Sequence, residues 1–222
     1  MGSDPSQMIT EAVLSEDGDH FILNGEKLWC TNGLKADVII VMAKTPNKKG
    51  RKQISAFIVE MSYPGVKIEQ RCRFMGLRAL YNGIVSFENV KIPRENIILG
   101  EGRGMKVALG TLNIGRLTLP AICVGSIKWM LKVCREWAST REQWGCAIGK
   151  HSAIADKIAK LAANTFAMES MVLLTAQMAD NKNHDIRVES AIAKMWGTEV
   201  AWEMIDETMQ IRGGRGYETA QS

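Results

Sequence analysis

Residues 100–149 read GEGRGMKVALGTLNIGRLTLPAICVGSIKWMLKVCREWASTREQWGCAIG, and this stretch decides how the chain is organised. It opens on three glycines, continues as an apolar segment with helical spacing, and closes on a basic turn that contains tryptophan and glycine. No charged residue lies between Arg116 and Lys128. The pattern therefore predicts one long helix that is buried for much of its length and that either kinks at Pro120 or has an unpaired backbone carbonyl near it.

The sequence before this stretch predicts β-strands. Two turn dipeptides, Asn24-Gly25 and Asn32-Gly33, flank a short run with the alternation of a strand, which is a hairpin signal. Further strands are expected at residues 36–43, 54–60, 66–69 and 83–87.

The sequence after the long helix predicts two more helices, at residues 150–182 and 185–211. The later helix includes Met195 and Met209, and methionines at helical spacing favour core packing over a ligand surface. Strands followed by helices indicate an α+β chain.

The composition of the 222 residues excludes several classes of protein. With 46% apolar and 23% charged residues the chain can build a core, and its net charge of +4 is too small to indicate nucleic acid. The five cysteines form no CxxC pair and do not cluster with histidines, so we expect neither a metal site nor a disulfide framework. Their odd number suits a reducing compartment. We expect no membrane-spanning segment and no signal sequence.

Arg116 is the first candidate functional residue, because it lies inside the apolar run. A guanidinium kept in such surroundings costs about 2–5 kcal/mol unless it meets an anion. The partner is either a neighbouring aspartate or glutamate, which would make the arginine structural, or a bound anionic group.

Two glycine-rich stretches could hold an anion. Gly100, Gly102 and Gly104 imitate a dinucleotide-binding fingerprint, but a second helix follows where a Rossmann unit needs a parallel strand. Residues 210–217, QIRGGRGY, combine three glycines with two arginines, which suits an anion such as a pyrophosphate. A plain glycine cap at a helix end is the structural alternative.

Five motifs, taken together, resemble the acyl-CoA dehydrogenase family. They are EKLWCTNG (26–33), MGLR (75–78), GMKVA (104–108), REQWG (141–145) and QIRGGRGY (210–217), in the order seen in that family. The resemblance covers essentially the whole chain and is closest to the very-long-chain type through LNIGR (112–116). The residues GSD at 2–4 look like the end of the family's TExxxGSD signature, so the chain would begin inside that motif.

The resemblance implies a fold and its two domains. The fold class would be α+β, with an orthogonally packed β-domain at 1–98 that contacts flavin and substrate. A truncated, incomplete up-down helical bundle would follow at 99–222. The family's N-terminal helical domain is absent, so we expect a fragment.

The resemblance also implies an FAD-dependent α,β-dehydrogenation of fatty acyl-CoA thioesters, a step of fatty acid β-oxidation. In the family a glutamate removes the α-proton, the β-hydrogen passes as hydride to N5 of FAD, and an electron-transfer flavoprotein accepts the electrons. We expect a homo-oligomer, a dimer or a tetramer, because the family's glycine turn reaches the FAD of a neighbouring subunit. The compartment would be the cytoplasm of a bacterium or the mitochondrial matrix of a eukaryote.

Site residues carry over from the family by position. The FAD contacts would be Trp29, Cys30, Thr31, Arg141, Gln143, His151, Ser152, Gln210, Ile211, Arg212, Gly213 and Gly214. The substrate contacts would be Ser3, Asn113, Ile114, Gly115 and Arg116. Cys30 stands where the family usually has isoleucine, which is a small change.

No catalytic base is assigned. In some members the base directly precedes the arginine of the long helix, and that residue here is Gly115. In the others it lies in an EGT-type segment that would come after Ser222. We therefore expect an enzyme fragment that is inactive by itself. The alternatives are a non-catalytic flavin-binding or oligomerisation module on the same scaffold, and a protein whose glycine turns are only caps.

Overall fold

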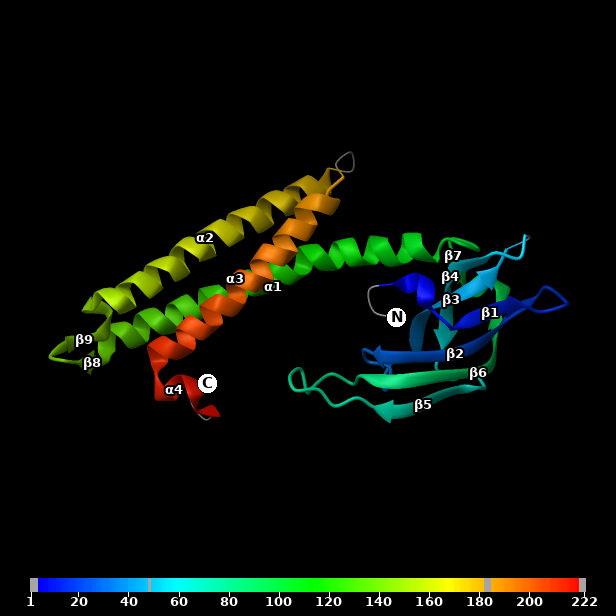
Figure 1. Cartoon of the computed structure of the whole chain (residues 1–222), viewed down its shortest axis with the longest axis horizontal. Helices are drawn as coiled ribbons and strands as arrows, with labels where there is room; N and C mark the ends of the chain where they lie inside the picture. Colours follow the sequence, from blue (N-terminus) through cyan, green and yellow to red (C-terminus); the bar gives the residue numbers. More distant parts are fainter. Residues whose placement is uncertain (1–3, 48, 182–184, 220–222) are drawn as a thin grey trace. The chain divides into compact units, whose positions relative to one another are not determined.

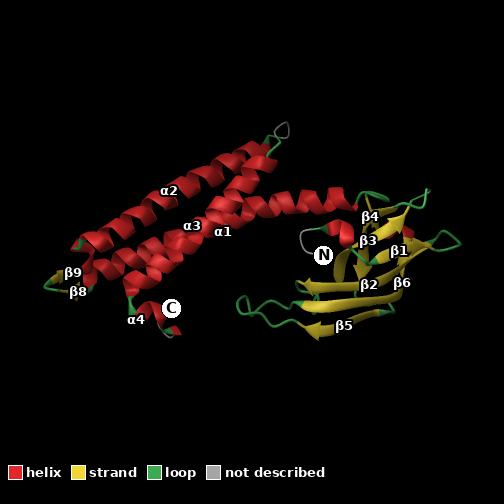
Figure 2. Cartoon of the chain, viewed as in Figure 1, coloured by secondary structure: helices red, strands yellow, loops and turns green. Residues whose placement is uncertain are grey.

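A computed structural model describes residues 4–47, 49–181 and 185–219. The chain divides into two compact units, Met1–Gly110 and Thr111–Ser222. The first unit holds the main β-sheet and the second is mostly helical (Figure 1, Figure 2). The predicted α+β class is therefore confirmed.

The first unit contains a seven-stranded mixed sheet with the strand order β5-β6-β2-β1-β3-β4-β7. All neighbouring strands are antiparallel except β1 and β3, which are parallel. The strands are β1 (Glu11–Leu14), β2 (His20–Cys30), β3 (Val38–Pro46), β4 (Lys52–Glu60), β5 (Val66–Arg71), β6 (Gly83–Pro93) and β7 (Ile97–Ile98). Short 3-10 helices lie at η1 (Pro5–Gln7) and η2 (Arg94–Asn96). The four strands predicted from residue 36 onward correspond to β3, β4, β5 and β6.

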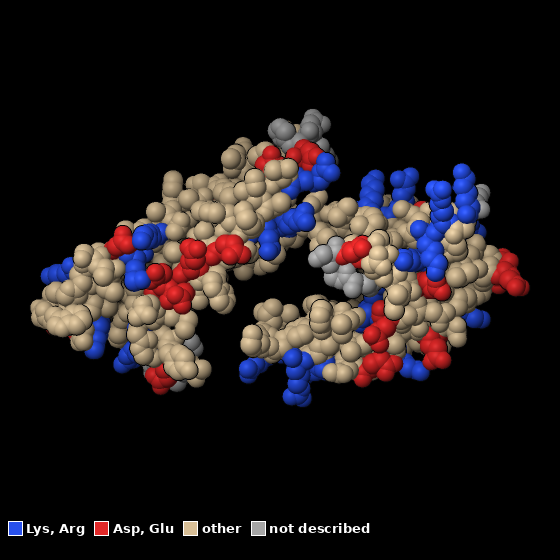
Figure 3. All heavy atoms as spheres, in the orientation of Figure 1, with Lys and Arg blue, Asp and Glu red and all other residues tan. Residues whose placement is uncertain are grey.

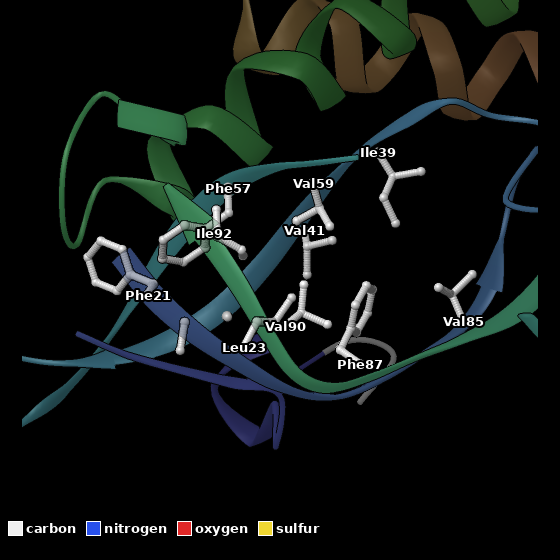
Figure 4. Close-up of a cluster of buried hydrophobic side chains, with 12 residues drawn as sticks. Phe21, Leu23, Ile39, Val41, Phe57, Val59, Val85, Phe87, Val90 and Ile92 are labelled. Carbon is white, nitrogen blue, oxygen red and sulfur yellow. The ribbon is translucent and has the colours of Figure 1, made fainter. Parts of the chain in front are cut away.

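The core of this unit forms where the sheet curls over its own buried face (Figure 4). Phe21 of β2 and Phe57 of β4 meet edge to face with ring centroids 5.0 Å apart, although β1 and β3 separate these strands in the sheet. Both rings are almost fully buried, and each such burial stabilises the fold by about 1.5–3 kcal/mol. This curvature accords with the orthogonal packing that was expected.

The hairpin predicted around the two Asn-Gly dipeptides is wrong. β2 continues through Asn24 and Gly25, and its pairing with β6 shifts register between Leu23 and Gly25. Gly25 has a φ of 132°, and a Cβ there would lie 2.8 Å from the Cα of Thr10. Glycine is therefore needed at this position for a bulge in β2 and for the close approach of the Thr10 backbone, and not for a turn. A turn does follow β2 at Asn32, but β2 pairs with β1 and β6 and not with β3.

The helices pack around a second core, in the second unit. They are α1 (Gly104–Thr140), α2 (Ser152–Asp180), α3 (Arg187–Arg212) and the short α4 (Gly214–Tyr217). Between α1 and α2 lie the small hairpin of β8 (Glu142–Gln143) and β9 (Cys146–Ala147) and the 3-10 helix η3 (Ile148–Lys150). Ile127 of α1, Leu161 and Met168 of α2 and Met204 of α3 are among its buried side chains. Pro120 is also buried, and a Cβ on Gly197 of α3 would lie 3.0 Å from the Cβ of Pro120, so the two helices are in close contact there.

The burial predicted for α1 and α3 is only partly correct. In α1 the buried apolar residues begin at Pro120, while Leu109, Leu112 and Ile114 are exposed. Met195 and Met209 of α3, predicted to be core, are exposed as well. The reason is that the described helices cover only one side of α1 and of α3.

The helix α1 has features in common with a membrane-spanning helix. In the part of the chain that the structure describes, α1 alone is long and apolar enough to cross a membrane by length and composition, and 11% of that window is buried. The expectation that no apolar run reaches spanning length is therefore corrected. The core helix of a water-soluble protein passes the same test, so this property is weak support for a membrane segment.

The three glycines at the start of α1 have a structural explanation. Gly100 and Gly102 have φ values of 88° and 74°, which favour glycine. The backbone N–H of Gly102 donates a hydrogen bond of 2.9 Å to the buried Oγ of Ser55 on β4. At Gly104 a Cβ would lie 2.7 Å from the backbone carbon of Ser55. These glycines therefore let the first turn of α1 lie directly against β4.

We predict that Gly104→Val lowers the free energy of unfolding by about 1–3 kcal/mol or more, because a side chain there must displace the backbone of β4. Gly110→Ala is the matched control, since a Cβ at that helical position meets no atom within 4 Å. The control should stabilise the chain by about 0.5–1 kcal/mol. Urea unfolding followed by circular dichroism measures both changes. Equal effects of the two substitutions would contradict this account of Gly104.

Candidate functional site

Trp29, Cys30 and Thr31 lie where β2 ends in the first unit. The pairing of β2 with β6 shifts register between Lys27 and Cys30, and Trp29 takes a φ of 57°, which is uncommon for an aromatic residue. The irregularity turns the indole outward, so that 63% of Trp29 is exposed. Thr31 is exposed beside it, whereas Cys30 is half-buried. The segment thus presents one aromatic plane and one hydroxyl group to solvent.

The turn that follows holds this segment in place. The N–H groups of Lys35 and Ala36 both donate to the carbonyl oxygen of Asn32, at 2.9 and 2.8 Å. Gly33 is buried, and a Cβ there would lie 3.1 Å from the Cβ of Cys30. Glycine at this position therefore lets the chain turn back directly against the end of β2.

Lys27 and Cys30 are residues of this region with shifted pKa values. Burial lowers the pKa of the Lys27 ammonium to about 8, although the nearby Cys30 opposes the shift. Burial also raises the pKa of the Cys30 thiol, and Lys27 opposes that shift. Both groups therefore favour their neutral forms more than they would in water.

In the second unit, three arginines surround one tryptophan. The guanidinium carbons of Arg141, Arg212 and Arg215 lie 6.0, 5.9 and 5.5 Å from the ring centroid of Trp137. Arg141 is one helical turn beyond Trp137, whereas the other two arginines come from the glycine-rich end of α3. Each cation–π contact contributes about 0.5–1 kcal/mol at an exposed site. The cluster concentrates positive charge at one place, which suits a multiply charged anion.

The β8–β9 hairpin lies directly after Arg141 and is held by His151. The Nε2 atom of His151 lies 3.1 Å from the carbonyl oxygen of Gln143 and 3.6 Å from the Sγ atom of Cys146. A carbonyl oxygen can only accept, so Nε2 carries the proton and donates it. The indole of Trp144 packs edge-on against the imidazole with centroids 5.6 Å apart. Ser152 follows as the first residue of α2 and is exposed.

The glycine turn at the end of α3 combines a cap with open space. Gly213 has a φ of 58°, and its N–H donates to the carbonyl oxygen of Gln210, so the cap expected as the alternative is present. At both Gly213 and Gly214 a Cβ would meet no atom within 4 Å. At Gly216 a Cβ would lie 2.5 Å from the carbonyl oxygen of Met209, so that glycine serves packing. The turn is therefore a cap that also has open space beside Gly213 and Gly214.

The predicted substrate residues lie on α1, and Arg116 is less buried than expected. Its side chain is half-buried, because the first half of α1 is exposed. It receives no carboxylate partner among the described residues, and its Nη1 donates to the Oδ1 of Asn113 at 3.2 Å. Ile114 is exposed, and Gly115 has open space around it. Ser3 lies outside the described residues.

The structure therefore brings together two of the predicted flavin segments and adds residues to them. Arg141 and Arg212, which are 71 positions apart in the sequence, share the ring of Trp137. Trp137 was not among the predicted site residues, and Arg215 was predicted only as one of the two arginines of the glycine-rich stretch at 210–217. The four-residue spacing from Trp137 to Arg141 could have revealed that pair, since such residues are neighbours on a helix. Ile211 is buried in the core, so only its backbone can face a ligand.

We predict that Lys27→Met stabilises the chain at pH 7 and that the gain shrinks as the pH rises from about 8 to 10.5. The folded state holds the Lys27 pKa below its ordinary value of 10.5, so the unfolded chain binds more protons within this window. The stability of the unmodified chain relative to the variant therefore increases with pH. Urea unfolding at pH 7 and pH 10 measures the difference. The exposed Lys35→Met is the control, and an equal pH response of both variants would contradict the assignment.

Comparisons with family models and with known proteins cover almost the whole chain. The family model described as "Acyl-CoA dehydrogenase, middle domain" matches residues 1–90, and the one described as "Acyl-CoA dehydrogenase, C-terminal domain" matches residues 102–222. The chain is 50% identical over its whole length to a protein of Mycobacterium tuberculosis named "Probable acyl-CoA dehydrogenase FadE10", and covers 34% of that protein. It is 37% identical to the very-long-chain specific acyl-CoA dehydrogenase of rat mitochondria over 97% of the chain, again covering 34% of the relative.

A solved structure has the same fold. The acyl-CoA dehydrogenase of Bacillus anthracis, crystallised as a complex with FAD, superposes with a TM-score of 0.90 at 34% identity. The match covers 100% of this chain and 40% of that protein. The chain spans about a third of the length of the curated relatives it matches. Both domain models and these relatives together show that the chain belongs to the acyl-CoA dehydrogenase family.

Proposed function

We propose that these residues are the flavin-binding and substrate-binding part of an enzyme that oxidises fatty acyl-CoA thioesters to their α,β-unsaturated products. The observation that carries the proposal is the convergence of Arg141, Arg212 and Arg215 on Trp137, beside a glycine turn with open backbone. Arginines beside a glycine-rich turn with open space are groups that can hold a pyrophosphate. Because the chain belongs to the acyl-CoA dehydrogenase family, the pyrophosphate of FAD is the anion expected there.

The residues of this chain fit FAD as the cofactor. The arginine cluster on Trp137 and the turn at Gly213–Gly214 would hold the pyrophosphate of an FAD bound by a neighbouring subunit, with Gln143 and His151 of the adjacent hairpin as further contacts. In the first unit, the exposed indole of Trp29 offers a plane for a flavin ring, and the hydroxyl of Thr31 can donate to a ring nitrogen. When bound, FAD would accept the hydride from the β-carbon of the substrate. Thr31 would stabilise the negative charge that this transfer delivers.

Arg116 would bind the substrate on its coenzyme A side. Its guanidinium is held by Asn113 and makes no ion pair with a carboxylate within the described ranges, so its charge remains available for an anionic or polar ligand group. Ile114 and Gly115 beside it leave room for a ligand on this face of α1. This arrangement supports the anion as the partner of Arg116 and disfavours the internal carboxylate.

We propose further that the base which removes the α-proton is not supplied by α1. Gly115 occupies the helical position directly before Arg116 and has no side chain to accept a proton. The electrons would leave through an electron-transfer flavoprotein, and the complete protein would be a homo-oligomer. Gly115 also favours a second candidate, in which the scaffold binds flavin or assembles with other chains but performs no chemistry.

We predict that Arg116→Ala and Arg141→Gln have crossed effects. Arg116→Ala should weaken acyl-CoA binding, whereas Arg141→Gln should weaken FAD binding, each by about tenfold or more, since a hydrogen bond to a charged group contributes about 1.5–3 kcal/mol. Flavin fluorescence measures the dissociation constant of FAD, and calorimetric titration with palmitoyl-CoA measures that of the substrate. Each variant serves as the control for the other. Equal loss of both ligands in Arg116→Ala would assign that arginine a structural role.

We predict that the 222-residue chain loaded with FAD keeps its flavin oxidised when palmitoyl-CoA is added without air. General-base assistance is worth about 10² to 10⁴ in rate, and no base stands before Arg116. Gly115→Glu is the informative variant, because a Cβ there meets no atom within 4 Å and the substitution would place a carboxylate at that position. It should bleach the flavin absorbance slowly. Rapid bleaching by the unmodified chain would mean that another residue of this chain is the base.

A further inference from the structure

A second basic cluster lies in the first unit, on the loop between β5 and β6. Arg71, Arg73 and Arg78 line one cavity of about 340 Å³. Arg71 and Lys35 share the ring of Tyr81, with the guanidinium carbon 5.1 Å and the ammonium nitrogen 5.5 Å from its centroid. Figure 3 shows basic side chains gathered at the tip of this loop. Four cations are thus collected around one loop and one aromatic ring.

These charges have no counterion within the described part of the chain. Among the residues that the structure describes, none of the four makes an ion pair with a carboxylate, although eight ion pairs occur elsewhere. Like charges held together raise the free energy of the free protein, and the ring of Tyr81 offsets only part of this cost. A bound anion would relieve the repulsion.

The loop is held in a defined shape. The N–H of Cys72 donates to the carbonyl oxygen of Asn82 at 2.9 Å, which joins the two ends of the loop. The Nη2 of Arg71 donates to the carbonyl oxygen of Arg78 at 3.4 Å, which draws the tip toward β5. Leu77 takes a φ of 49°, so the backbone is constrained at the tip. The loop that carries the arginines is therefore partly preorganised for binding a ligand.

We propose that this cavity binds a phosphate or pyrophosphate group. Guanidinium groups match the oxygen geometry of phosphate through paired hydrogen bonds, and a concave site favours a compact anion over a flat acidic surface. The volume is within the range of small-molecule sites, and Cys72, Phe74, Leu77 and Leu80 line the cavity beside the arginines. This site shares no residue with the arginine cluster on Trp137 and does not rest on the function proposed above.

The thiol of Cys72 lines the cavity and can report on its occupancy. In the assay 4,4′-dithiodipyridine reacts with the thiol: the Cys72 sulfur displaces one pyridine sulfur, a mixed disulfide forms, and 4-thiopyridone leaves and is measured by absorbance. No other oxidant is needed. The kinetic phase of this thiol reaction that is lost in Cys72→Ser is assigned to Cys72. This readout reports the surroundings of Cys72, a residue that is not part of the arginine cluster on Trp137.

The expected result is that inorganic pyrophosphate slows the Cys72 phase saturably at constant ionic strength. At about ten times its dissociation constant, a ligand that covers the thiol should slow the reaction about tenfold. Arg73→Gln and Arg78→Gln should abolish this protection. Arg51→Gln, an exposed arginine on the β3–β4 turn, should retain it. Adenosine 3′,5′-bisphosphate distinguishes the source of the bound phosphate group. Stronger protection by this compound than by pyrophosphate indicates the phosphate of a coenzyme. Weaker protection indicates a free phosphate.

Two outcomes would overturn the proposal. One is equal slowing by potassium chloride and by pyrophosphate at the same ionic strength, which would leave only general screening. The other is protection by a glutamate-rich peptide with none by either phosphate compound, which would make the loop a surface for an acidic protein.

Discussion

The close approach of the start of α1 to β4 is the constraint on which the first unit depends most. The hydroxyl groups of Thr45 and Ser55 lie 2.7 Å apart in the buried interior, and Ser55 also accepts the N–H of Gly102. Buried hydroxyls must be paired, so this network ties two strands to the segment before the helix. At position 104 there is no space for a side chain between α1 and β4. These contacts fix the first turn of the helix against β4.

Aromatic rings organise the positive charge in both units. Trp137 gathers three arginines, and Tyr81 gathers an arginine and a lysine. The face of an aromatic ring attracts cations, so it can hold several at a separation that they would otherwise avoid. Such a cluster is stabilised further when an anion binds. The same physical device therefore underlies the flavin site proposed in the second unit and the phosphate site proposed in the first.

Much of the candidate site could be predicted from sequence, because its segments are local. The Trp29–Thr31 segment ends a strand and the Gln210–Gly214 segment ends a helix, and each belongs to a short motif through which the family resemblance locates it. Burial was predicted less well. Met195 has the helical spacing of a core residue and yet is exposed, because periodicity shows which residues share a face but not whether another helix covers that face. The same reason explains why Arg116 is only half-buried.

The sequence by itself determined the α+β class, the order of strands and helices, the long helix after the glycines, and the family to which the motifs belong. These properties depend on local periodicity and on residue types at short spacing. Only the tertiary structure decided that Gly25 serves a bulge against Thr10, that Arg212 joins Arg141 on Trp137, and that the curled sheet brings Phe21 to Phe57. Each of these is a contact between residues far apart in the chain. Such contacts depend on how whole elements pack, which local patterns do not specify.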